Sequence, residues 1–391
     1  MLAKLCGWFR TRRPECHTVC FHWQTWDAVG MALLADGVGI TKNAFKMDFI
    51  PPQEGVNHLI DELRAGTPRS EILVTDGFFQ RQFYPFDMEI AGEAPTAHGA
   101  PTASPSGAPL VAEWKAADGG GTAKILFDPV GDPFLSQHRL KGKPFLPGVV
   151  GLESLAEAAS CALGGQAVSE VRNVRIKNGM MFSTDAAMGA RVEVTPAEGG
   201  FTCRLLTEQR DRKGRMIDPA RLHVEGFVPS TPDASPLQGE PLERPPLGWF
   251  PHAYPDEGLL YHGQPLRCLK ECAYQYDGGW GKIVAPSLAE LAGPRGEAGW
   301  MTPPAVLDAC VVACGSFLFL QFGGVLEVPY EFERLRVARM PRAGETCIIR
   351  LFFRERGERH SRFDFTLYGE DDQPLLQVDS YRTIRVGAGG R

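Results

Sequence analysis

The sequence has 391 residues, of which 43% are hydrophobic and 23% are charged, and its formal net charge is -6. This length predicts about two or three globular domains, each large enough to bury its own core. The acidic balance and the absence of a Lys/Arg run argue against a nucleic-acid-binding protein, which needs positive charge to neutralise phosphates. Residues 1–6 do not resemble a secretory signal. We therefore expect a cytoplasmic protein that does not bind a membrane.

The first residues that could bind a metal are the two cysteines and two histidines of segment 16–22. Zinc sites usually take four ligands as two spaced pairs, and no second Cys/His pair follows this segment. We therefore expect a buried strand at residues 18–23 and no metal site. Other cysteines, such as Cys161 and Cys310, lie within apolar patterns where a thiol behaves as a small hydrophobic side chain.

Two proline-rich stretches, residues 91–109 and 229–246, divide the chain. They contain too few large apolar side chains to bury a core of their own, which is typical of linkers. They predict an N-terminal piece at residues 1–87, a middle unit at residues 88–235 and a C-terminal unit at residues 236–391.

The middle and C-terminal units repeat one order of predicted elements, an apolar helix followed by four strands. The helices are expected at residues 149–163 and 305–320, and the second is predicted to be buried and not to cross a membrane. The strands are expected at residues 170–177, 190–195, 201–208 and 221–228, and at residues 330–338, 346–353, 362–368 and 375–386. A helix that is apolar on all sides must be covered on nearly all sides, so each sheet should wrap around its helix. The pattern predicts an α+β fold in which the two units pair their sheets edge to edge.

A motif with the spacing H-x3-G-x4-P lies just before the first helix and contains His138, Gly142 and Pro147. Gly142 and Pro147 shape the turns between His138 and the helix, and Gly148 lets its backbone come close to a ligand. The first amides of a helix are unpaired donors with partial positive charge, which suits a thioester carbonyl that acquires negative charge. The segment therefore predicts a ligand site at the start of this helix.

Asp308 is the second candidate for a functional group, because it lies within the apolar helix predicted at residues 305–320. A carboxylate buried there without a partner would cost several kcal/mol, and proteins keep such groups mostly for a task. The alternative is that Asp308 caps the helix by accepting hydrogen bonds from its first amides.

The motif from His138 to Gly148, together with segment 304–309, resembles the dehydratase domains of polyketide and polyunsaturated-fatty-acid synthases. It is similar, more distantly, to the free-standing β-hydroxyacyl-carrier-protein dehydratases. The resemblance covers residues 88–391 and implies a double hotdog, in which two antiparallel sheets each wrap around a central helix. It also implies that His138 is the base and Asp308 the acid that dehydrate a β-hydroxyacyl thioester on an acyl carrier protein, without a cofactor. The residues expected to contact the substrate are Gly142, Pro147, Gly148 and Tyr261.

Three features depart from the pattern of the family. Glu153 resembles the acid of the free-standing enzymes, but its partner histidine is missing, since none occurs between His262 and His360. We therefore expect one active site, with Glu153 either a relic of a second site or a structural residue of the helix. Val312 stands where many relatives carry the Gln or His that holds the acid. The family's Tyr-Gly-Pro element is matched only loosely by residues 261–265, and His262 is expected at the rim of the substrate tunnel or on the surface.

The N-terminal piece resembles the end of a synthase ketoreductase domain, on residues 21–32 and 50–55. This resemblance implies a small α/β remnant whose nucleotide loop and catalytic tyrosine would lie upstream, so we expect no NADPH binding. The expected partners are an acyl carrier protein, other synthase domains and a second copy in a homodimer. A catalytically inactive hotdog scaffold and a hotdog isomerase or thioesterase are the alternative functions.

Overall fold

The described part of the chain forms two compact units, each of which is treated separately. The computed structural model describes residues 107–182, 184–210, 216–237, 248–255, 260–296, 299–323 and 327–385, with shorter pieces of the N-terminal region and a few single positions. The first unit contains Met1–Ile90, Pro255–Gly258 and Gly387–Arg391, and the second contains Ala91–Tyr254 and Leu259–Val386. The predicted linker at residues 91–109 lies almost entirely outside the described residues, and the predicted domain boundaries stay predictions.

The N-terminal unit is a small α/β arrangement. Strand β1 (Cys20–Trp23) pairs in parallel with β2 (Glu71–Val74), and helix α3 (Pro52–Ala65) lies between them in the sequence. Parallel strands need a crossover of this kind, because a tight turn cannot join them. The strand predicted at residues 18–23 is present as β1, but the prediction that it is buried was wrong, since only Cys20 of its residues is buried and His22 is exposed. The resemblance to a ketoreductase stays a prediction. Most of the segment 24–49, which carries part of that resemblance, lies outside the described residues.

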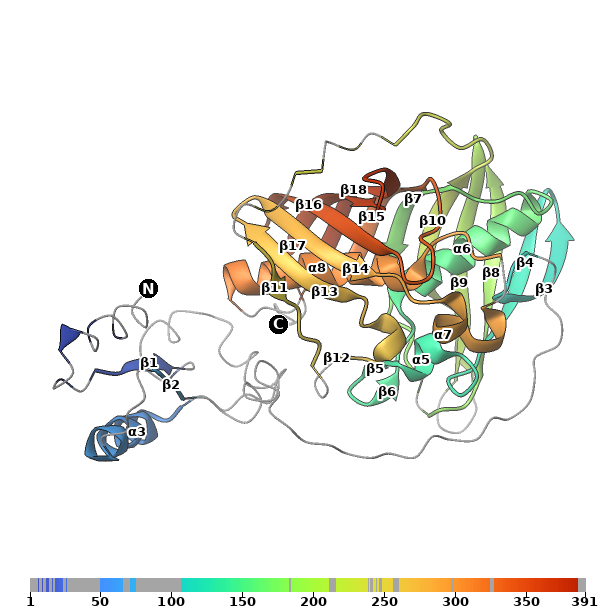
Figure 1. Cartoon of the computed structure of the whole chain (residues 1–391). Coiled ribbons are helices and arrows are strands. Elements are labelled where there is room, and N and C mark those ends of the chain that lie inside the picture. The colour runs from blue at the N-terminus through green and yellow to red at the C-terminus, as the bar shows by residue number, and fades with distance from the viewer. Residues whose placement is uncertain are drawn as a thin grey trace. The chain divides into compact units, whose positions relative to one another are not determined.

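The second unit is built around two long helices, α6 (Gly148–Ala162) and α8 (Pro304–Phe322), which pack against each other (Figure 1). α8 is long and apolar enough to cross a membrane by composition alone. It is nevertheless a core helix, because its side chains are buried against β13 and β14, as predicted. It ends at Gly323, which adopts the left-handed conformation that favours glycine.

Thirteen strands of the described residues form one antiparallel sheet around these helices (Figure 1). Their order is β11 (Phe250–Pro251), β13 (Leu269–Gln275), β14 (Gly278–Val284), β16 (Thr346–Arg356), β17 (His360–Tyr368), β18 (Pro374–Arg385), β15 (Glu327–Val337), β7 (Glu170–Ile176), β10 (Met216–Pro229), β9 (Gly200–Arg210), β8 (Met188–Ala197), β4 (Gly120–Phe127) and β3 (Val111–Ala117). The two halves join where β15 pairs with β7, with Phe332 opposite Val174 and Leu335 opposite Val171. The predicted double hotdog with edge-to-edge sheets is therefore present.

Every strand predicted after the two helices is present, but the hairpin that precedes each helix was not predicted. These hairpins are β3–β4 in the first hotdog and β13–β14 in the second. Glycines at the start of the second strand of each hairpin, among them Gly120, Gly121 and Gly278, interrupt the alternation of apolar and polar side chains that identifies a strand. The Asp118-Gly119 pair was an overlooked signal, since both residues take the positive φ of a tight hairpin turn.

Short elements before α6 and α8 complete the unit. They are α5 (Pro133–Ser136), β5 (His138–Leu140), β6 (Lys143–Pro144), β12 (Leu260–His262), η2 (Gln264–Leu266), α7 (Leu288–Ala292) and η3 (Gly293–Arg295). β12, β5 and β6 form a separate small sheet in which β12 comes from the second half of the chain. This sheet brings residues of both hotdogs to the start of α6.

Candidate active site

The hairpin β5–β6 positions His138. Its turn consists of Lys141 and Gly142, whose φ values of 52° and 75° match the two-residue turn that suits paired strands. Gly142 is exposed, and a Cβ built on it would meet no atom within 4 Å. Its visible role is to let the hairpin close, and its contact with a substrate stays a prediction.

The imidazole of His138 is buried, and its protonation is defined by one neighbour. Nδ1 lies 2.5 Å from the carbonyl oxygen of Phe145. A carbonyl can only accept, so Nδ1 carries the proton and Nε2 of the neutral ring is an acceptor. Burial, together with the nearby His262, lowers the pKa of His138 to about 4. At neutral pH the residue is therefore an uncharged base.

Asp308 lies on α8 after the first turn, and it makes no cap. The N-cap residue is Pro303, and the first turn contains no acidic side chain, so the capping alternative is wrong. Asp308 Oδ2 is 3.3 Å from Nε2 of His262, and the structure gives this buried oxygen no well-formed hydrogen bond. A buried carboxylate oxygen left so poorly paired is costly, which favours a functional role.

His262 is buried beside these two residues, and the expectation of a rim or surface position was wrong. Its exposed fraction is 6%. In the pairing of β12 with β5 it lies opposite His138, and the two ring centroids are 5.0 Å apart. A ring nitrogen of His138, a ring nitrogen of His262 and a carboxylate oxygen of Asp308 lie within 4.8 Å of one another. The structure thus brings together two residues that the sequence singled out and one that it did not.

The other predicted contact residues lie around this group in different ways. Gly148 is the first residue of α6, and a Cβ there would approach Ile176 Cδ1 to 2.6 Å, so glycine allows α6 to pack closely on β7. Pro147 is the N-cap residue and is buried. Tyr261 precedes His262 on β12, and successive side chains of a strand point to opposite faces. Tyr261 therefore points away from the histidines, toward Arg267, whose guanidinium lies 5.7 Å from its ring centroid.

Glu153 on α6 occupies the corresponding place in the other half. Its carboxylate accepts hydrogen bonds from the amides of Met301 (2.7 Å) and Thr302 (2.8 Å) and from the Thr302 hydroxyl (2.5 Å). Burial raises the pKa of Glu153 to about 7 against these hydrogen bonds, which lower it. These bonds tie α6 to the chain just before α8, and no histidine lies among the partners that the structure shows. The contacts agree with a structural role.

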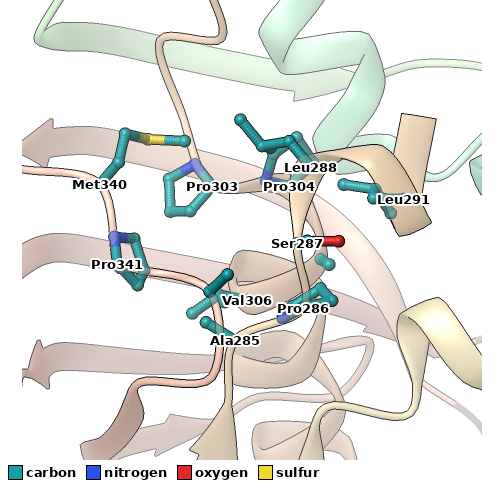
Figure 2. A pocket seen from close by; sticks show the side chains of 12 residues that line it. Ala285, Pro286, Ser287, Leu288, Leu291, Pro303, Pro304, Val306, Met340 and Pro341 are labelled. Atoms are coloured by element: carbon teal, nitrogen blue, oxygen red, sulfur yellow. The ribbon is translucent and has the colours of Figure 1, made fainter. Parts of the chain in front are cut away.

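An apolar pocket of about 210 Å³ lies at the start of α8 (Figure 2). It is lined by Ala285, Pro286, Ser287, Leu288, Leu291, Pro303, Pro304, Ala305, Val306, Met340, Pro341 and Ala343. None of these side chains titrates near neutral pH, so the pocket has no acid or base of its own. The first turn of α8, the helix that carries Asp308, forms part of its wall. The groups able to do acid–base chemistry are instead His138, His262 and Asp308.

Two family models match the second unit. The model described as "Polyketide synthase dehydratase domain" matches residues 114–208, and the one described as "Polyketide synthase dehydratase N-terminal domain" matches residues 256–391. Together these matches cover more than half of the chain. Each of them includes one of the two predicted catalytic residues, His138 in the first and Asp308 in the second.

Similar proteins agree with this match. The polyketide synthase ThaG of Burkholderia thailandensis is 32% identical over 117 residues, which are 29% of this chain but only 2% of that synthase. The dehydratase domain from the CurJ module of the curacin polyketide synthase superposes with a TM-score of 0.59 at 14% identity, covering 71% of this chain and 96% of that one. The dehydratase domain of RzxB from Pseudomonas fluorescens gives 0.55 at 17% identity, covering 70% and 98%. At these identities the superpositions show the fold, and the two family models show that this chain belongs to the polyketide synthase dehydratase family.

Proposed function

We propose that this chain removes water from a β-hydroxyacyl thioester carried by an acyl carrier protein during polyketide synthesis. The observation that carries the proposal is the meeting of His138 and Asp308 in one buried site, although they come from different hotdogs. One is a neutral base and the other a carboxyl group, the pair of groups that an elimination of water requires.

The proposed reaction follows from the positions of these two groups and from the neutral ring of His138. Nε2 of His138 takes the proton from the α-carbon, and the electron pair of that bond forms the double bond between the α- and β-carbons. The β-hydroxyl leaves as water with a proton that the carboxyl of Asp308 donates. The amide of Gly148, at the start of α6, would polarise the thioester carbonyl. The thioester itself acidifies the α-proton, so the reaction needs no cofactor.

The proposed partners follow from the substrate. The acyl chain would arrive on the phosphopantetheine arm of a carrier protein, and other synthase domains would supply and consume it. A cytoplasmic location and a homodimer belong to the same proposal.

The test is incubation with a β-hydroxyacyl-pantetheine thioester and mass spectrometry for the loss of water. General acid and base groups contribute about 100- to 10,000-fold, so His138→Ala and Asp308→Asn should each lose activity by that order. Glu153→Gln is the matched control, because it changes a buried carboxyl outside the proposed chemistry and should lose little.

Each variant must first be shown to fold by circular dichroism. Wild-type turnover by His138→Ala would contradict the assignment of the base. If Glu153→Gln and Asp308→Asn both folded and lost activity equally, the acid would have been assigned to the wrong helix. A hydrolysed or isomerised product would favour the thioesterase or isomerase alternative.

A further inference from the structure

We propose that His262 is a positioning residue for Asp308 and supplies the support that Val312 cannot give. This inference rests on the proposed function, because it assigns a role to a neighbour of the proposed acid. It starts from the contact between His262 Nε2 and Asp308 Oδ2, 3.3 Å apart, in a region where both side chains are almost fully buried.

Val312 leaves Asp308 without a partner on its own helix. Residues four apart on a helix lie on one face, so a polar side chain at this position of α8 could reach the carboxylate. Valine offers no donor, and Asp308 Oδ2 has no well-formed hydrogen bond in the resting protein. An acid that must point at one substrate atom then needs support from another element.

The backbone around His262 is held firmly enough to give that support. β12 pairs with β5 on one side, and the amide of Gly263 donates to the carbonyl oxygen of Gln137 at 2.7 Å. Nε of Arg267 donates to the carbonyl oxygen of His262, also at 2.7 Å. The ring of Tyr254 packs against the imidazole with 5.5 Å between centroids. The imidazole is therefore fixed before a substrate arrives.

Other titratable groups also lie around Asp308. Burial raises the pKa of the Cys310 thiol, and it also raises the pKa values of the Tyr254 and Tyr381 phenols. These groups stay neutral near pH 7. Of the two buried histidines beside Asp308, His138 has the separate task of taking the substrate proton, so His262 is the one that can hold the acid in place.

The contact also connects the acid to the base. The neighbouring His262 is one of the causes that lower the pKa of His138, after burial. Removing the imidazole of His262 should therefore raise the pKa of His138 as well as loosen Asp308. A residue that only filled space would not produce both effects.

The kinetic test compares His262→Ala, His262→Gln, Val312→Gln and the double variant His262→Ala/Val312→Gln. Loss of a group that orients a functional side chain typically costs about 10- to 100-fold, so kcat of His262→Ala should fall by that order with KM little changed. His262→Gln keeps a donor and should lose less. The double variant should recover several-fold over His262→Ala, because glutamine at position 312 restores a donor on the face of α8 that carries Asp308.

Two further readouts separate positioning from packing. The acidic limb of the pH profile of kcat/KM should move to higher pH in His262→Gln. His252→Ala is the matched control, because His252 packs on Tyr254 at 4.7 Å between ring centroids and belongs to the same aromatic group without reaching Asp308. It should leave both kcat and the acidic limb unchanged.

An NMR measurement decides the pairing without any turnover. Asp308→Asn should shift the side-chain nitrogen resonances of His262 and leave those of His223 unchanged, since His223 is bonded to Thr207 and Asn178 elsewhere. If wild-type protein released no water, the proposed function would fail, and the NMR response would still decide the contact. Unchanged His262 resonances, or a double variant no faster than His262→Ala, would overturn the inference.

Discussion

His138 shows how a single hydrogen bond can set the chemistry of a residue. The Phe145 carbonyl fixes the proton on Nδ1 and leaves Nε2 free to accept, while the buried surroundings disfavour the charged ring. The ring of His138 is therefore already neutral at pH 7, and its Nε2 can accept a proton without help from another residue. The same burial makes the base less strong, so the thioester must supply much of the acidity of the α-proton.

The lowered pKa of His138 predicts the pH dependence of the reaction. A base works only when it is unprotonated, and a pKa of about 4 means that kcat/KM is lost only as the pH falls through about 4. An unperturbed histidine would lose activity near its ordinary pKa of about 6.5. The measurement is a pH profile of kcat/KM, with circular dichroism at each pH to show that the protein is folded. An acidic limb near the ordinary histidine value would contradict the described environment.

At the residue scale, the sequence indicated two of the three buried groups. His138 stood out because its spacing to Gly142 and Pro147 is specific, and Asp308 stood out because a carboxyl is costly in an apolar helix. His262 could not be placed in the same way. Its burial depends on the pairing of β12 with β5, which joins segments more than 100 positions apart, and neither strand is longer than 3 residues. Strands this short carry no periodic pattern that a sequence analysis could detect.

At the scale of elements, prediction succeeded where hydrophobic periodicity is long. The helices and the eight strands after them differ from the predicted bounds mainly at their ends, because helix ends and strand ends are set by local hydrogen bonds. The hairpins before the helices, and the small sheet that carries His138, depend instead on glycines and on tertiary pairing. The small sheet that carries His138 and His262 is thus the part of the site that periodicity describes least well.

The turn of the β5–β6 hairpin offers a test at this scale. Gly142 has a φ of 75°, so Gly142→Ala should lower the free energy of unfolding by about 1 to 2 kcal/mol. It should also lower kcat, because the hairpin holds His138. Gly142→Asn is the matched control, since asparagine tolerates the left-handed conformation, and it should keep most of the stability and activity. The checks are urea unfolding and steady-state kinetics. If both variants raised KM equally without destabilising the protein, Gly142 would act by contacting the substrate.

At the scale of the whole unit, the two hotdogs share one sheet and one core. Buried side chains from both halves belong to a single apolar cluster. Polar contacts reinforce the junction: Nε of Arg334 on β15 bonds to Glu170 on β7 at 2.6 Å, and Asp233, in the segment that connects the halves, bonds to both residues. Part of the stretch predicted as a linker is therefore tied to the junction. A composition rich in proline could not show this, because the partners lie on distant strands.

Arg295 forms a second polar contact between the two hotdogs, and this one is buried. It follows α7 in the second hotdog, and its Nε lies 2.7 Å from Asp132 in the first, where both side chains are largely buried. It also donates to the carbonyl oxygens of Pro109 (3.1 Å) and Leu126 (2.6 Å). Removing this one side chain takes the guanidinium away from one oxygen of the buried Asp132 carboxyl and from two carbonyl groups, all of which belong to the other hotdog.

Arg295→Met should therefore destabilise both hotdogs together. Breaking a buried ion pair by removing one partner costs about 3 to 5 kcal/mol, and a shared sheet should pass this loss to the whole unit as one cooperative transition. Arg354→Met is the matched control, because its pair with Asp364 is more exposed and lies within one hotdog, and it should cost less than about 1 kcal/mol. Unfolding in urea would be followed both by tryptophan fluorescence and by circular dichroism. A continuous sheet cannot lose one half while the pairing of β7 with β15 remains intact. Two separate unfolding transitions in wild-type protein, or an effect of Arg295→Met on only one of them, would therefore show that the hotdogs fold as independent units.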